Sequence, residues 1–238
     1  MYKSKILMGL VLIVYVLSVL FQFGNDSSIA NSLKSFIIPI FTLLYFVTVK
    51  KKSLFFLLFL VLYAVSDLLL FIAPYISNKV NYYMGNSLYI LAYTFLLLEV
   101  CKSVCVLYVL KNYKIHLLVL TILNIYIIYV LHVIVAPYVA KTNEFYVELV
   151  YNIVMLLVLS LTLVNYFYRD NVKSLYLFLG AMCIVFSEVI WIAYGYISAS
   201  TFLNIVSTSL YMLSFYFFYI QSKLVYEERE EEVEILIN

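Results

Sequence analysis

Eight long apolar runs alternate with short polar, charged or proline-containing segments along the chain. Each run is close to the roughly 20 apolar residues that a helix needs to cross about 30 Å of hydrocarbon. Because hydrocarbon offers no partner for an unpaired backbone amide, each run is predicted to be a transmembrane helix. The fourth helix is predicted to continue to about Leu110. The runs are Ile6–Phe23, Leu33–Val49, Leu54–Ala73, Tyr82–Val100, Ile115–Val135, Phe145–Tyr168, Leu175–Tyr196 and Phe202–Gln221.

The composition supports an all-α fold, a polytopic membrane bundle of about eight transmembrane helices. Hydrophobic residues make up 66% of the chain and charged residues 12%, whereas a soluble domain carries about 25% charged residues. We expect one transmembrane domain over residues 1–224 and a short charged cytoplasmic tail over residues 225–238. No small-residue cleavage site follows the first run, so it is predicted to be retained. The net charge of +2 is too small to indicate a nucleic-acid partner.

Lysine and arginine placement predicts the orientation. With the N-terminus in the cytoplasm, the outer segments carry only Lys34, Lys79 and Lys141 of the 15 basic residues, and the cytoplasmic segments carry the rest. Cytoplasmic loops carry an excess of basic residues in membrane proteins. Both termini are therefore predicted to be cytoplasmic, and a bacterial inner membrane is the expected location.

An internal repeat relates the third run to the seventh. The two segments are SDLLLFIAPYIS (66–77) and SEVIWIAYGYIS (187–198), and further on Ser87-Leu88-Tyr89 aligns with Ser209-Leu210-Tyr211. Runs one to four and five to eight would then be related by an axis along the membrane normal, as in proteins with parallel repeats. The alternative is chance similarity within a restricted apolar alphabet.

The repeat aligns two carboxyls, those of Asp67 and Glu188. Asp67 lies seven residues before Pro74, and Glu188 lies eight residues before Tyr196, so both lie roughly 10–12 Å below the outer surface. Ionisable residues at such depth usually face a bundle interior and serve a function. Two carboxyls in different protonation states form a general acid and a general base. The alternative is a structural pair satisfied by polar groups of neighbouring helices.

Further polar residues occur at the same predicted depth, and together they indicate a cavity that opens outward. On the helix of Glu188, Gly180 and Ala181 share roughly the face of the carboxyl, and small residues there allow close helix packing. The other polar residues of this layer are Asn86, Tyr89, His132, Glu148, Asn152, Asn204, Ser207 and Thr208.

These motifs resemble the lysoplasmalogenase, or YhhN-like, family of membrane proteins. The family has about eight spans, and the resemblance covers roughly residues 30–224 in the family's order. Two positions depart from the family pattern: Asn86 stands where the family usually has His, and Glu188 where it usually has Asp. The matching residues are Ser66-Asp67 with Leu68-Leu69-Leu70, Gly85 and Tyr89, Gly180-Ala181 with Ser187-Glu188, and Tyr219 with Gln221.

The resemblance implies hydrolysis of the vinyl ether bond of a lysolipid. Asp67 and Glu188 would then be catalytic, and the residues expected to bind substrate are Ser66, Asn86, Tyr89, Ser187 and Trp191. The implied partner is a membrane lipid or lysolipid, and this chemistry requires no metal or organic cofactor. The alternatives are a proton-coupled transporter and a non-catalytic lipid-binding membrane protein, which would use the same carboxyls as a proton or ligand site.

Overall fold

A computed structural model describes residues 2–24, 26–139 and 144–225. The described residues form α-helices and two short 3₁₀ turns, and eight helical segments among them are long and apolar enough to cross a membrane. The predicted all-α polytopic bundle is therefore confirmed, while the tail over 226–238 lies outside the described residues. The elements are α1 Tyr2–Phe23, α2 Ser27–Lys34, α3 Ile37–Thr48, α4 Leu54–Leu68, η1 Leu69–Phe71, η2 Ala73–Tyr75, α5 Asn78–Lys102, α6 Val106–Asn112, α7 Lys114–Val139, α8 Glu144–Arg169, α9 Val172–Tyr196 and α10 Thr201–Lys223.

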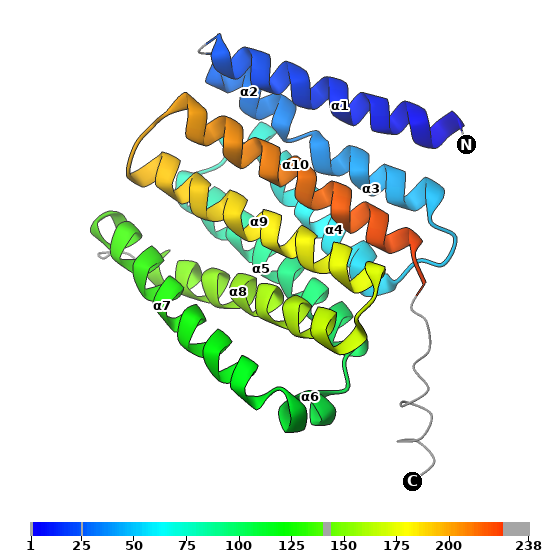
Figure 1. Cartoon of the computed structure of the whole chain (residues 1–238). Coiled ribbons are helices and arrows are strands. Elements are labelled where there is room, and N and C mark those ends of the chain that lie inside the picture. The colour runs from blue at the N-terminus through cyan, green and yellow to red at the C-terminus, as the bar shows by residue number, and fades with distance from the viewer. Residues whose placement is uncertain (1, 25, 140–143, 226–238) are drawn as a thin grey trace.

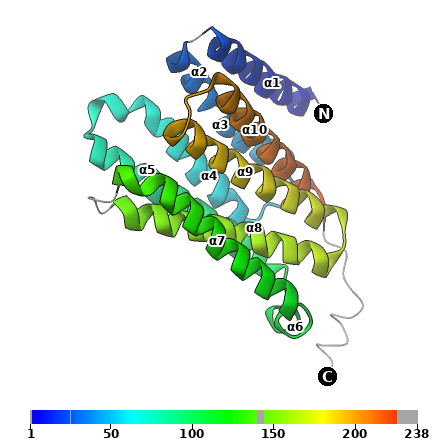
Figure 2. The same ribbon diagram turned by 60° about the vertical axis from the view of Figure 1, so that its left-hand side comes forward.

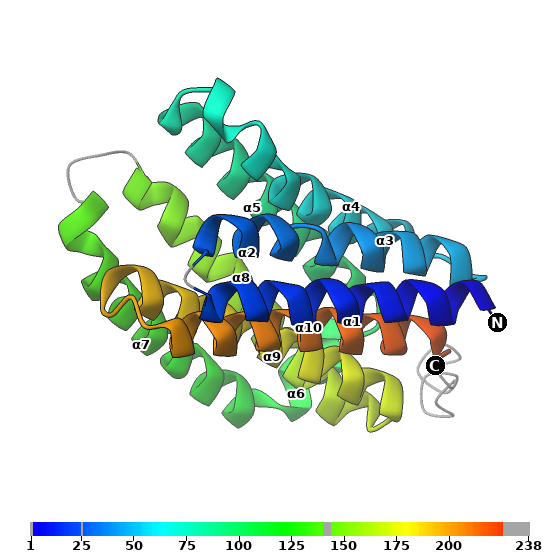
Figure 3. The same cartoon turned by 90° about the horizontal axis from the view of Figure 1, so that it is seen from above.

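Six helices form a closed ring in the order α3, α4, α5, α8, α9, α10 and back to α3, since each contacts the next. Helix α1 lies outside this ring against α3 and α10, and α7 lies outside it against α8 and α9, on another side of the bundle (Figures 1 and 2). The start of α1 and the end of α10 lie at the same end of the bundle (Figure 3). We call the opposite end, where α9 finishes, the Tyr196 end.

Two predicted helices are divided in the structure. The second run is not one helix, because a turn at Ser35 and Phe36 separates α2 from α3. The predicted continuation of the fourth helix to Leu110 is wrong, since α5 ends at Lys102 and α6 is separate. The Ser103 hydroxyl lies 2.8 Å from the Val100 carbonyl and 2.9 Å from Asn165 Oδ1, so its one hydrogen is shared between these two acceptors at the turn.

Contacts between helices agree with the predicted repeat. Ser66 Oγ donates to the Gly85 carbonyl at 3.0 Å and joins α4 to α5. Ser187 Oγ donates to the Ser207 carbonyl at 2.8 Å and joins α9 to α10. Positions 85 and 207 correspond in the same alignment that pairs Tyr89 with Tyr211, so equivalent serines make equivalent bonds. Superposition of the two halves about one axis stays a prediction.

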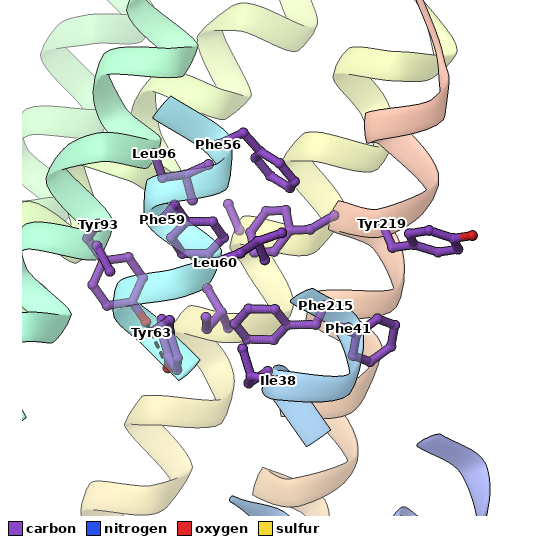
Figure 4. Close-up of a cluster of buried hydrophobic side chains, with 14 of the residues drawn as sticks. Ile38, Phe41, Phe56, Phe59, Leu60, Tyr63, Tyr93, Leu96, Phe215 and Tyr219 are labelled. Atoms are coloured by element: carbon purple, nitrogen blue, oxygen red, sulfur yellow. Dashed lines mark hydrogen bonds between the residues drawn. The ribbon is translucent and has the colours of Figure 1, made fainter. Parts of the chain in front are cut away.

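Aromatic side chains fill the centre of the ring (Figure 4). The Phe59 ring stacks on Phe215 with centroids 5.8 Å apart and meets Phe218 edge-on at 5.4 Å. All three rings are buried. Phe218 lies directly over Gly180, where a Cβ atom would come within 2.6 Å of the ring. The predicted close packing at Gly180 is therefore confirmed between α9 and α10.

Candidate functional site

A cavity of about 380 Å³ lies toward the Tyr196 end, and both aligned carboxyls line it. Its walls come from α2, α4, α5, α9 and α10. The structure brings together every residue that the sequence nominated for the site, although their roles stay predictions. The nominated residues are Asp67, Glu188, Ser66, Asn86, Tyr89, Ser187 and Trp191.

Two phenols hold the Asp67 carboxyl. The Tyr89 hydroxyl donates to Oδ1 at 2.6 Å, and the Tyr211 hydroxyl donates to Oδ2. Tyr89 and Tyr211 are the tyrosines that the repeat aligns, so one residue from each half binds the same carboxyl. An ionised carboxylate could accept both of these bonds, because it is acceptor-only.

Glu188 has a different environment. The Tyr63 hydroxyl donates to Glu188 Oε1 at 3.1 Å, and Tyr151 is a second phenol hydrogen-bonded to this carboxyl. The Tyr63 ring is 1% exposed and meets the Tyr89 ring edge-on at 4.7 Å, so the phenols of the two carboxyls touch. The sequence placed both carboxyls at equivalent positions, but the structure gives Asp67 both aligned tyrosines. Each carboxyl is therefore held by two phenols, and the two pairs come from different positions of the fold.

Lys34 is a site residue that the sequence analysis counted only as an outer charge. It is the last residue of α2, and its ammonium lies 4.5 Å from the Trp191 ring centroid and 5.0 Å from that of Tyr211. Its position inside the predicted second span was the available signal, because charged residues within spans are usually functional. Among the described lining residues, Lys34, Asp67 and Glu188 are the charged ones.

The remaining polar residues of the predicted layer do not all reach this cavity. Ser207 lines it, but His132, Glu148 and Asn152 line a much smaller space beside α7 and α8. Another small space, beside α1, is lined by residues that include Asn204 and Thr208. The expectation of one shared cavity is thus wrong for these five residues, because their helices turn them toward other neighbours.

Three of the nominated residues donate hydrogen bonds to backbone carbonyls. Ser66 and Ser187 donate to carbonyls of adjacent helices, and Asn86 Nδ2 donates to the Tyr82 carbonyl at 3.0 Å. The single hydroxyl donors of Ser66 and Ser187 are engaged in the cavity wall, whereas Asn86 keeps a second N–H and its side-chain oxygen for contact with a ligand.

Comparison with known proteins adds no identity: no family model, no curated protein and no solved structure matches this chain. The chemistry of the site therefore has to be argued from its geometry.

Proposed function

We propose that this protein is a membrane hydrolase that cleaves the vinyl ether bond of a lysolipid, as the resemblance to lysoplasmalogenases implies. The observation that carries the proposal is the shared cavity of Asp67 and Glu188, two carboxyls from matched positions of a repeat that are held by different pairs of tyrosines. Paired carboxyls whose environments differ are the usual means of dividing acid and base roles.

The reaction needs one proton donor and one carboxylate. In the proposed mechanism Glu188 gives its proton to the alkenyl carbon of the vinyl ether, which leaves an oxocarbenium ion. The Asp67 carboxylate stabilises that cation and takes a proton from the attacking water. The resulting hemiacetal breaks its C–O bond to the glycerol as its hydroxyl proton passes to the departing oxygen, which gives a fatty aldehyde and a glycerophospho-alcohol. The proton that Asp67 took from water returns to Glu188 and restores the starting state.

The floor of the cavity is closed, as hydrolysis with access from one side requires. Beneath Tyr63 the layer of Phe59, Phe215 and Phe218 fills the ring with side chains that are about 0–1% exposed. A transporter using the same carboxyls would have to separate Phe59 from Phe215 to pass a substrate. A hydrolase needs access from one side only, because aldehyde and alcohol can leave by the entrance.

The proposed orientation places both termini in the cytoplasm and the cavity toward the outer leaflet of a bacterial inner membrane. Its support is the scarcity of basic residues in the segments at the Tyr196 end. A lysolipid in that leaflet has a single tail, so its polar end can tilt into the cavity while the tail stays in hydrocarbon.

Aldehyde release by the purified protein tests this function. Wild type in detergent should release a long-chain aldehyde from a lysoplasmalogen without added metal or nucleotide. Asp67→Asn and Glu188→Gln should each lower the rate by about 10²–10⁴-fold, the usual contribution of a general acid or base.

Glu99→Gln is the matched control for this test. Glu99 lies at the opposite end of α5, where it accepts a hydrogen bond from Ser53 and pairs with Lys102 at 3.9 Å. Its variant should keep the wild-type rate. Wild type that releases no aldehyde, or Asp67→Asn that keeps full turnover, would contradict the hydrolase; proton-coupled flux into vesicles would then favour transport.

A further inference from the structure

The break in the second span brings a lysine into the cavity. Because α2 ends at Lys34 and α3 begins at Ile37, the chain turns at the level of the site. Broken helices at membrane depth occur where the backbone lines a cavity, and they are common at substrate sites. The Lys34 side chain extends from this turn into the space that holds the two carboxyls.

The ammonium of Lys34 contacts two aromatic rings, and its charge also acts on the Glu188 and Asp67 carboxyls from beyond ion-pair distance. It lies over Trp191 and Tyr211, and within the part of the chain that the structure describes it makes no ion pair. An ammonium in a low-dielectric site is costly unless an anion or several acceptors satisfy its three donors. Cation–π contact uses the charge of the ammonium but none of its N–H groups as conventional donors. The site thus presents a cation with unused donor capacity.

The position of this cation relative to the carboxyls defines a spacing. Trp191 follows Glu188 by three residues on α9, so its Cα atom lies nearer the Tyr196 end by about 4.5 Å along the helix axis, and the ammonium contacts its ring. The glycerol of a lysolipid separates its ether oxygen from its phosphate by three carbons, which is a comparable length. With the ether at the carboxyl pair, the phosphate would reach the level of Trp191, whose ring the Lys34 ammonium contacts.

We propose that Lys34 is the residue that selects an anionic, phosphate-bearing headgroup for this cavity. The inference rests on the proposed function for the placement of the ether at Asp67 and Glu188. An anionic ligand would otherwise meet two acidic residues and no compensating charge among the described lining residues. Trp191 and Tyr211 fix the ammonium, and the bond from Tyr211 to Asp67 couples the headgroup position to the carboxyl pair.

Binding rather than turnover tests this role. In the Asp67→Asn background, which should bind without hydrolysis, affinity is measured for a single-chain alkyl glycerophosphate and for the same alkyl glycerol without phosphate. The phosphate lipid should bind at least tenfold more tightly. Lys34→Gln should abolish that preference and leave the affinity for the neutral lipid unchanged, whereas Lys34→Arg should keep the preference. Lys79→Gln, an exposed lysine at the same end of the bundle, should have no effect.

The outcomes separate this inference from the proposed function. The role of Lys34 is overturned if the Asp67→Asn protein binds both lipids with equal affinity. It is also overturned if Lys34→Gln lowers the affinity for both lipids by the same factor. Glycerol phosphate without a tail should bind far more weakly than the lipid, and equal affinity would assign the site to a soluble phosphate ester instead. If Lys34→Gln loses the phosphate preference but wild type releases no aldehyde, the hydrolase proposal is refuted. The role of Lys34 in binding a phosphate headgroup then still holds.

Discussion

The contact between Gly180 and Phe218 gives a quantitative prediction about how the site is held. An ideal Cβ atom at position 180 would lie 2.6 Å from two carbons of the Phe218 ring and 3.2 Å from a third. Carbon atoms pack at about 3.5–4.0 Å, so Gly180→Ala requires the ring to move by roughly 1 Å. Phe218 has no exposed surface and meets Phe59 edge-on at 5.4 Å and Phe215 edge-on at 5.8 Å, so the ring has little room.

The magnitude follows from two opposing effects. Overpacking a filled core costs about 1–3 kcal/mol, and replacing Gly by Ala within a helix recovers about 0.8–1 kcal/mol. Because the Phe218 ring is enclosed, we expect Gly180→Ala to lower the free energy of unfolding by about 1–2 kcal/mol. Gly195→Ala is the matched control on the same helix, since nothing lies within 4 Å of its added Cβ, and it should be neutral or slightly stabilising.

Reversible denaturation in detergent micelles, followed by tryptophan fluorescence, measures both variants. Phe218→Leu removes the ring that clashes. In that background Gly180→Ala should lower the free energy of unfolding much less than in wild type, with a coupling energy between the two substitutions of about 0.5–3 kcal/mol. If Gly180→Ala is as stable as Gly195→Ala, or if Phe218→Leu does not relieve it, the packing of α9 on α10 is not the one described.

Two further predictions concern the carboxyl site and the orientation. Tyr211→Phe removes one of the two phenols on Asp67 and should lower aldehyde release by about 10–100-fold, because a hydrogen bond to a charged group contributes about 1.5–3 kcal/mol. Tyr216→Phe lies on the same helix but outside the cavity and should keep the wild-type rate. Equal effects of the two variants would refute the specific role of Tyr211. A single cysteine at Asn78 in a cysteine-free background should react with an impermeant thiol reagent on intact cells, whereas one at Lys51 should not, and the reverse pattern would invert the proposed orientation.

The sequence alone determined the fold class, because the evidence for it is local. Each apolar run has the length of a membrane span, and a single span in hydrocarbon has to be a helix whatever its neighbours are. The candidate carboxyls were also accessible from the sequence, since the repeat places Asp67 and Glu188 at matched depths and charge at such depth is expensive.

Only the tertiary structure decided which side chains meet. Nothing in the hydropathy pattern shows that the second span breaks after Lys34, that Tyr89 and Tyr211 bind the same carboxyl, or that Glu148 faces a different space. The depth of a side chain in the membrane follows from counting residues along one helix. The direction in which that side chain points depends on how its helix is rotated against its neighbours. That rotation is set by close packing between helices, such as Phe218 over Gly180, and such contacts join residues far apart in the sequence.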